Sequence, residues 1–281
     1  MPLFKSVSLV TNLIKGYTLQ QALKITADCG FSLVEIASIG GMCEHVLPDD
    51  ITPDFIASLV EALKTANLSS YAFSGHVDLT LDGGLADFLK KMDLAAGIGC
   101  TLINTNSGPL ERIDEFKRNI KKVIERAERL GLTVCLESHG DIVGDAKQAA
   151  PLFKEINHPL IRFNYDTGNT YFYSKGKTVI EDDILYALEY LAYLHVKDIS
   201  IAGNRACYKP LGEGDVNLPG VFASLAQLGR PIDCGLEIPV FVEGTLDLLS
   251  SSAAPIPEER IRAVTGSSMD FLKRSGVLDN S

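Results

Sequence analysis

The feature of this sequence that most constrains its fold is a repeated alternation of short apolar segments with longer amphipathic ones. The strand-like apolar runs are residues 3–10, 31–38, 68–75, 100–108, 132–137, 160–166, 193–200 and 231–238. Helical patterns follow them, one opening at Thr18 and the others at 52–67, 84–99, 111–131, 146–156, 181–192, 218–229 and 257–276. Several strand-like runs are apolar on consecutive residues, as in parallel strands covered on both faces. Eight strand–helix units in 281 residues predict a single-domain (β/α)8 TIM barrel over residues 1–281.

An open, doubly wound sheet is the competing architecture. No glycine-rich dinucleotide fingerprint or Walker motif follows any early strand, and this disfavours the open sheet. The helix predicted at 111–131 has its apolar side chains on one face and charged side chains on the other. That pattern is typical of a helix on the outside of a barrel.

Charge and composition exclude some classes of function. The chain has 26 Lys and Arg against 36 Asp and Glu, a net charge of −10, so nucleic acid is not an expected partner. No apolar run reaches membrane-spanning length, and the first residues lack the apolar core of a signal peptide,. The six cysteines form no CxxC pair, which is typical of small buried side chains in a reducing compartment. We expect a cytoplasmic protein that does not bind membranes.

Polar residues end four consecutive predicted strands. They are Glu137, Asp166, His195 and Glu237. Each has an ordinary explanation alone, since Glu and Asp occur at helix caps and turns and a buried His is often only hydrogen-bonded. In a TIM barrel, however, the carboxyl ends of the strands meet at the active-site face. Three buried carboxylates brought together there need a cation, so the four residues predict a divalent metal site.

The donor types narrow the choice of metal. Oxygen and nitrogen donors without thiolate suit Mn²⁺, Mg²⁺, Co²⁺ or Zn²⁺. Three carboxylates favour the harder ions, and we expect Mn²⁺ first.

Further polar residues near the predicted strand ends are candidates for binding substrate. They are His76, His139, Asn104, Asn169 and Arg205. His139 has a second interpretation as a residue that orients a metal ligand. The asparagines suit turns, and Arg205 suits a solvated loop. Lys197 is a candidate for catalysis or for a salt bridge to Asp166 or Asp198.

The motifs that carry these residues resemble the xylose isomerase-like TIM barrel superfamily, which contains sugar phosphate isomerases and epimerases. The resemblance covers nearly the whole chain and rests on "CLESHG", "NYDTGN", "LHVKD", "LGEGDVN" and "GLEIP", in that order. It implies that Glu137, Asp166, His195 and Glu237 bind the metal. It also implies proton transfer next to the carbonyl of a ketose or keto-sugar, phosphorylated or not, through an enediolate, with Glu137 and Glu237 as the catalytic acid and base. Homodimers or homotetramers are common in such families.

Alternative functions remain on the same scaffold. A lyase similar to keto-inositol or dehydroshikimate dehydratases would form the same enediolate and then expel a hydroxyl. A non-catalytic carbohydrate-binding barrel would bind metal without exchanging substrate protons. Endonuclease IV, another member, surrounds three metals with many histidines, whereas this acidic chain has five in all. The sequence has no Trp, so Phe and Tyr of residues 171–176 are the candidates for an aromatic wall.

Overall fold

The barrel predicted from the alternation is present in the computed structural model, which describes residues 2–252 and 254–278. Its eight parallel strands are β1 Phe4–Val10, β2 Val34–Ile39, β4 Ala72–Ser74, β5 Leu102–Thr105, β6 Thr133–Glu137, β7 Ile161–Asp166, β8 Leu191–Val196 and β11 Ile232–Leu236. Their order around the ring is β1-β11-β8-β7-β6-β5-β4-β2, and pairing of β1 with β2 closes it. The fold is therefore a single (β/α)8 TIM barrel.

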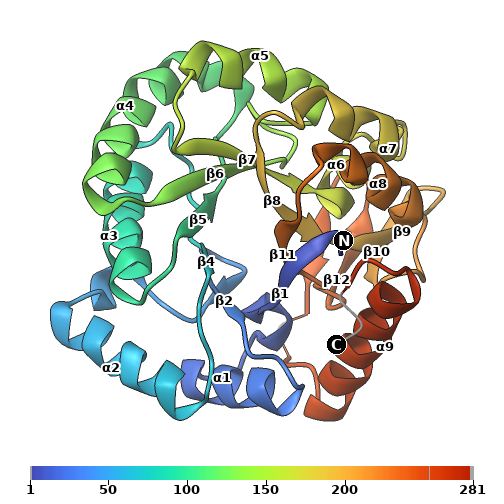
Figure 1. Ribbon diagram of the computed structural model, residues 1–281, viewed down its shortest axis with the longest axis horizontal. Helices are drawn as coiled ribbons and strands as arrows, with labels where there is room; N and C mark the ends of the chain where they lie inside the picture. Colours follow the sequence, from blue (N-terminus) through green and yellow to red (C-terminus); the bar gives the residue numbers. More distant parts are fainter. Residues whose placement is uncertain (1, 253, 279–281) are drawn as a thin grey trace.

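Helices surround the barrel on its outside (Figure 1). They are α1 Leu19–Asp28, α2 Pro53–Thr65, α3 Asp82–Gly97, α4 Ile113–Leu130, α5 Ala146–Ile156, α6 Thr167–Tyr173, α7 Ile180–Asp183, α8 Leu218–Leu225 and α9 Glu258–Arg274. Local sequence signals set several of their starts. Thr18 forms a reciprocal capping box with Gln21 at α1, and Thr52 caps α2, which begins with Pro53,.

The helix predicted at 181–192 is much shorter than expected. Helix α7 ends at Asp183 and continues only as a 3-10 turn at Ile184–Ala187. Strand β8 begins at Leu191, so the last residues assigned to the helix are strand. In addition, α6 starts directly after Asp166, where a turn was the local structure considered from the sequence.

A second, smaller sheet was not predicted. It is antiparallel and contains β9 Asp198–Ala202, β10 Arg205–Lys209, β12 Val242–Thr245 and β13 Leu249–Ser251. The strand expected at 193–200 is in fact the end of β8 and the start of β9, with Lys197 between them. Another short strand, β3 Cys43–Glu44, pairs with the end of β2. These segments extend the carboxyl-end rim of the barrel.

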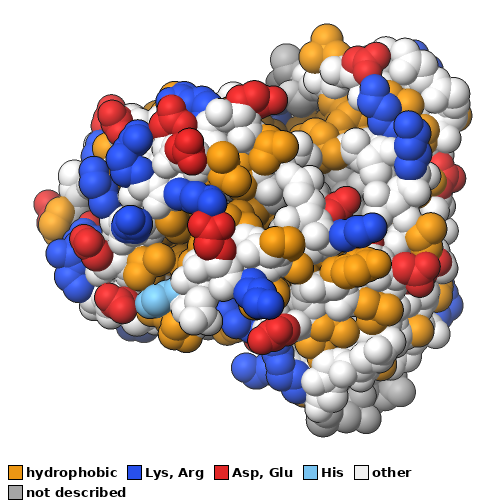
Figure 2. All heavy atoms as spheres, turned by 90° about the horizontal axis from the view of Figure 1, so that it is seen from above, with side chains coloured by type: hydrophobic (Ala, Val, Ile, Leu, Met, Phe, Trp, Pro, Cys, Tyr) orange, Lys and Arg blue, Asp and Glu red, His pale blue; other side chains and the backbone are white. Residues whose placement is uncertain are grey.

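The first and last described segments of the chain lie together at the amino end of the barrel. At the amino end, the segment that leads into β1 contacts the segment after α9, because the backbone N–H groups of Leu3 and Phe4 both donate to Val277 O at 3.0 Å. Charged side chains of both signs are interspersed over the face in Figure 2, and hydrophobic ones gather where its upper edge is hollowed. No helix in the described residues is both long and apolar enough to cross a membrane.

Candidate metal centre and cavity

The four predicted metal ligands converge. One donor atom from each of Glu137, Asp166, His195 and Glu237 lies within 4.8 Å of the other three. His195 Nδ1 is 2.7 Å from Glu237 Oε2, 3.0 Å from Glu137 Oε2 and 3.7 Å from Asp166 Oδ2. All four side chains are buried. The carboxyl ends of β6, β7, β8 and β11 therefore form one cluster of three carboxylates and an imidazole.

Asp166 illustrates how local structure and site coincide. Its Oδ1 accepts the backbone N–H of Asn169 at 2.8 Å and thereby caps α6,. Its Oδ2 faces His195 in the cluster. One oxygen of this carboxylate thus caps the helix, and the other is free to face the cluster.

Amide side chains orient the two glutamates. Asn169 Nδ2 donates to Glu137 Oε1 at 2.7 Å, and Asn12 Nδ2 donates to Glu237 Oε1 at 2.7 Å. In both residues Oε1 is thus held from outside the cluster, and Oε2 points toward His195.

Lys197 supplies one positive charge to this group. Its Nζ is 2.7 Å from Asp166 Oδ2, 2.9 Å from Glu237 Oε1 and 3.9 Å from Glu137 Oε1. The neighbouring Asp198 faces elsewhere. Its carboxylate accepts the backbone N–H groups of Gly212 and Gly214, which explains the pairing of "LHVKD" with "LGEGDVN". Of the two alternative salt-bridge partners considered for Lys197, Asp166 is the one that the structure places beside it.

The electrostatics fit a cation. Burial, together with Glu137 and Glu237, raises the pKa of Asp166 to about 8 even though Lys197 acts in the opposite direction,. Within the described residues, Asp166 Oδ2 and Glu237 Oε2 are buried and have no partner other than the ion pairs with Lys197 and His195. Carboxylate and imidazole donors are those that Mg²⁺, Mn²⁺ and Zn²⁺ accept in proteins. These residues can therefore hold a divalent ion.

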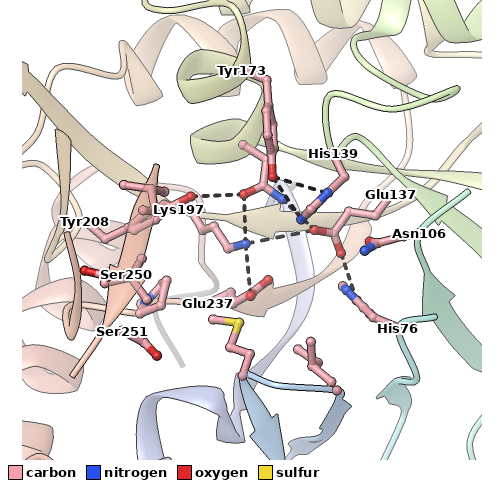
Figure 3. A pocket seen from close by; sticks show the side chains of 17 residues that line it. His76, Asn106, Glu137, His139, Tyr173, Lys197, Tyr208, Glu237, Ser250 and Ser251 are labelled. Atoms are coloured by element: carbon pink, nitrogen blue, oxygen red, sulfur yellow. Dashed lines mark hydrogen bonds and ion pairs between the residues drawn. The ribbon is translucent and has the colours of Figure 1, made fainter. Parts of the chain in front are cut away.

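A cavity of about 350 Å³ opens above the cluster (Figure 3). Glu137, Glu237 and Lys197 lie on its wall, whereas Asp166 and His195 are not among the described lining residues. Its other walls are formed by Ile39, Gly40, Met42, His76, Asn106, His139, Asn169, Tyr173, Tyr208, Pro239, Val242, Leu249, Ser250 and Ser251. The volume is at the small end of the range for ligand sites. Only the two glutamates of the metal cluster are thus placed to reach a bound molecule.

Three of the predicted substrate-binding residues line the cavity. His76 Nε2 is 3.1 Å from Glu137 Oε2, and Asn169 lies beside the same glutamate. His139 packs against Tyr173 with ring centroids 4.9 Å apart. Tyr173 supplies the aromatic wall expected from residues 171–176.

The other two predicted residues lie elsewhere. Asn104 is fully buried on β5 and donates to Glu35 Oε1 at 2.8 Å, below the cavity. Arg205 is exposed at the start of β10, opposite Ala202 and Thr245. The β9–β10 hairpin turns at residues 203–204 and takes Arg205 away from the cavity.

Several residues that line the cavity or contact the cluster were not predicted from the sequence. Tyr208, Ser250 and Ser251 come from the unpredicted sheet. Asn12 lies in a 3-10 turn after β1. Glu35 interrupts the apolar run 31–38 just as Glu137 interrupts its own run, but it stands at the second residue of β2 rather than at the strand end. A charged residue inside an apolar run was therefore the sequence signal that could have identified Glu35.

Comparison with solved structures identifies similar barrels. D-psicose 3-epimerase with D-tagatose from Clostridium cellulolyticum H10 has a TM-score of 0.75 and 16% identity, covering 97% of this chain and 100% of that one. A xylose isomerase-like TIM barrel protein from Mycobacterium smegmatis in complex with magnesium has a TM-score of 0.73 and 15% identity, covering 97% of this chain and 96% of that one. The probable 3-DHS dehydratase AsbF from Bacillus anthracis has a TM-score of 0.69 and 17% identity, covering 95% of this chain and 98% of that one. At these identities the likeness shows the fold.

The sequence itself identifies the family. No curated protein matches the chain. A family model described as xylose isomerase-like TIM barrel matches residues 23–273. This segment includes all four converging ligands. The chain therefore belongs to the xylose isomerase-like TIM barrel family.

Proposed function

We propose that this protein is a divalent-metal-dependent isomerase or epimerase that acts on a ketose or keto-sugar by moving a proton next to a carbonyl. The observation that carries this proposal is that two of the four cluster residues also line the cavity. Glu137 and Glu237 belong both to the donor set and to the cavity wall, so each glutamate can meet metal and substrate at once.

The residues take the following roles. A divalent ion held by the cluster would supply positive charge that stabilises an anion formed next to the carbonyl. Glu137 removes the proton from the carbon, and Glu237 returns one from the other side. Asn169 and Asn12 keep Oε1 of these glutamates oriented. We place Mn²⁺ first for the ion, on the count of three carboxylates, and Mg²⁺, Co²⁺ or Zn²⁺ after it.

Polar groups around the cavity suit the hydroxyls of a sugar. His76, Asn106, Tyr208 and Ser250 are on the wall (Figure 3). Asn169 also lines the cavity. Within the described residues Asn106 Oδ1 is buried and has no hydrogen-bond partner. A substrate hydroxyl would satisfy it. The names of similar structures, which include D-psicose 3-epimerase and L-ribulose 3-epimerase, agree with a sugar of monosaccharide size.

A dehydratase is the second candidate. His139 and the Tyr173 hydroxyl lie 3.2 Å apart on the cavity wall, where they could protonate a departing hydroxyl. One similar structure is a probable dehydratase. The same enediolate would form first, and loss of water would follow.

The test is a screen of keto-sugars and keto-inositols with Mn²⁺, followed by NMR and mass spectrometry in deuterated water. We expect solvent deuterium in a product of otherwise unchanged composition. Loss of one water would establish the dehydratase. Metal binding without deuterium exchange in any substrate would indicate a non-catalytic barrel and refute both enzymatic proposals.

A further inference from the structure

Glu35 occupies the interior of the barrel directly below the candidate metal centre. It is 0% exposed, and its Oε1 is 3.0 Å from His195 Nε2. Strands β2 and β8, which carry these residues, are separated in the sheet by β1 and β11. The contact therefore crosses the barrel lumen and joins parts of the chain that are far apart in sequence.

Four side chains surround the Glu35 carboxylate. Besides His195, Ser74 Oγ donates to Oε1 at 2.6 Å and Asn104 Nδ2 donates to the same oxygen at 2.8 Å. The Tyr193 hydroxyl donates to Oε2 at 2.8 Å. Ser8 Oγ in turn contacts the Tyr193 hydroxyl at 2.7 Å. Residues of β1, β4, β5 and β8 thus fix a carboxylate on β2. Among the described residues, His195 is the member of the metal cluster that contacts it.

These contacts fix the orientation of the His195 ring and keep hydrogen on its Nε2 atom. A carboxylate only accepts hydrogen bonds, so its contact with Nε2 requires hydrogen on Nε2. On the other side of the ring, Asn164 Nδ2 is 3.1 Å from Nδ1. Nδ1 also faces Glu137, Asp166 and Glu237, with Glu237 Oε2 at 2.7 Å. By the same rule these carboxylates hold a hydrogen on Nδ1 in the metal-free protein. A bound ion would replace that hydrogen, so that Nδ1 presents its lone pair to the ion while Nε2 keeps its hydrogen toward Glu35.

We infer that Glu35 is a positioning residue for the metal centre, which holds His195 in the tautomer whose Nδ1 binds the ion. Tyr193 and Asn104 keep the carboxylate in place, so the role extends to them. Partners of this kind commonly change metal affinity 10- to 100-fold when removed. The inference rests on the metal site of the proposed function and is independent of which sugar reaction occurs there.

The chain offers a matched control for each variant. Asp183 is another buried carboxylate that accepts a tyrosine hydroxyl, from Tyr165 at 3.0 Å, and it lies outside the metal cluster and the cavity lining. Glu35→Gln is therefore compared with Asp183→Asn, and Tyr193→Phe with Tyr165→Phe. Both pairs remove a buried polar contact, but only the first member of each acts on His195.

The experiment measures Mn²⁺ affinity by calorimetry on metal-stripped protein, and the His195 tautomer by two-bond ¹H–¹⁵N NMR on the Mg²⁺-loaded, histidine-labelled protein. We expect Glu35→Gln to bind Mn²⁺ about 10- to 100-fold more weakly and Tyr193→Phe to lie between it and the unaltered protein. Both should weaken the Nε2–H signature. The control variants should melt earlier yet keep metal affinity and tautomer.

The outcomes separate the two proposals. Unchanged Mn²⁺ affinity in folded Glu35→Gln, or a Mg²⁺-loaded unaltered protein in which His195 has no hydrogen on Nε2, would overturn the positioning role while leaving the proposed function standing. If Glu35→Gln does not fold, unchanged affinity in Tyr193→Phe decides in the same way. Failure of the unaltered protein to bind any divalent ion would overturn the proposed function itself, and the role of Glu35 with it.

Discussion

Lys197 Nζ lies 2.7 Å from Asp166 Oδ2 inside the cavity wall, where both side chains are almost fully buried. One ammonium thus faces the three carboxylates of the cluster. Because like charges this close repel each other, the charge balance of the metal-free protein depends on this lysine.

We predict that Lys197→Met lowers the stability of the metal-free protein by about 3 kcal/mol, the usual effect of leaving a buried charge without its partner. Divalent ions should offset part of this loss, so Mn²⁺ should raise the melting temperature more in the variant than in the unaltered protein. The measurement is thermal unfolding with EDTA and with added Mn²⁺.

Lys91→Met is the control. Lys91 is equally buried, but its Nζ donates to the backbone carbonyls of Ser38 and His76. Its replacement should lower stability and leave the response to metal as it was. A melting temperature of the unaltered protein that is indifferent to both EDTA and Mn²⁺ would contradict the metal site altogether.

The sequence predicted the barrel and the convergence of Glu137, Asp166, His195 and Glu237 for a physical reason. Parallel strands covered on both faces must be apolar, so a carboxylate or imidazole that ends such a run is visible, as with Glu137 and Asp166. Each of these signals is local. The regular connection of successive strand–helix units then brings the strand ends together.

The remainder of the site depends on contacts that no local pattern records. Glu35 has its role because His195 faces it across the barrel, 160 positions later in the chain. Tyr208 and Ser250 reach the cavity because β10 and β12–β13 pair in an antiparallel sheet. Arg205 belongs to the same sheet and was misplaced for the same reason, since a hairpin turn reverses the chain just before it.

Gly140 lies next to His139 and has a backbone that favours glycine. Its φ is +75°, and an added Cβ would collide with the ring of Tyr173. We predict that Gly140→Ala displaces Tyr173 and His139 from the cavity wall and raises KM for the substrate, while Mn²⁺ affinity is unchanged. The strain alone should cost about 1–3 kcal/mol of stability.

Gly30→Ala separates the two effects. Gly30 has φ of +85°, and no atom lies near its would-be Cβ, so this variant should lose stability and keep its KM. Unchanged KM in Gly140→Ala would mean that the His139–Tyr173 wall does not touch the substrate.

Asp141, beside the cavity mouth, gives a prediction for pH. Burial, opposed by a hydrogen bond from Gly108 and aided by Asp78, raises its pKa to about 6. A carboxyl whose pKa is higher folded than unfolded binds its proton more tightly in the folded state. Its contribution to stability therefore falls as pH rises from about 4 to 6 and stays low above that.

Asp141→Asn should remove this loss. We expect the variant to be more stable than the unaltered protein at pH 7 by about 1 kcal/mol, less than the shift implies because 28% of the side chain is exposed,. The difference should vanish near pH 4. Urea unfolding across this range measures it, and a constant difference at all pH values would contradict the assignment.

Variants of the two glutamates, Glu137 and Glu237, test the proposed chemistry. If Glu137 and Glu237 only hold the ion, replacing either with Gln should reduce metal content and activity together. If they also move protons, metal-loaded Glu137→Gln and Glu237→Gln should retain the ion but lose about 10²–10⁴-fold in turnover, which is the usual contribution of general acid–base catalysis.

The variants need not be equal, because each glutamate serves one face of the reacting carbon. One of them should still exchange the substrate proton with deuterated solvent while failing to complete the reaction, an outcome that a purely metal-binding role cannot produce. Deuterium incorporation, product formation and metal content are measured on the same samples. Full turnover by either metal-loaded variant would place the acid or base elsewhere. His139 and Lys197, which line the same cavity, would then be the next side chains to replace.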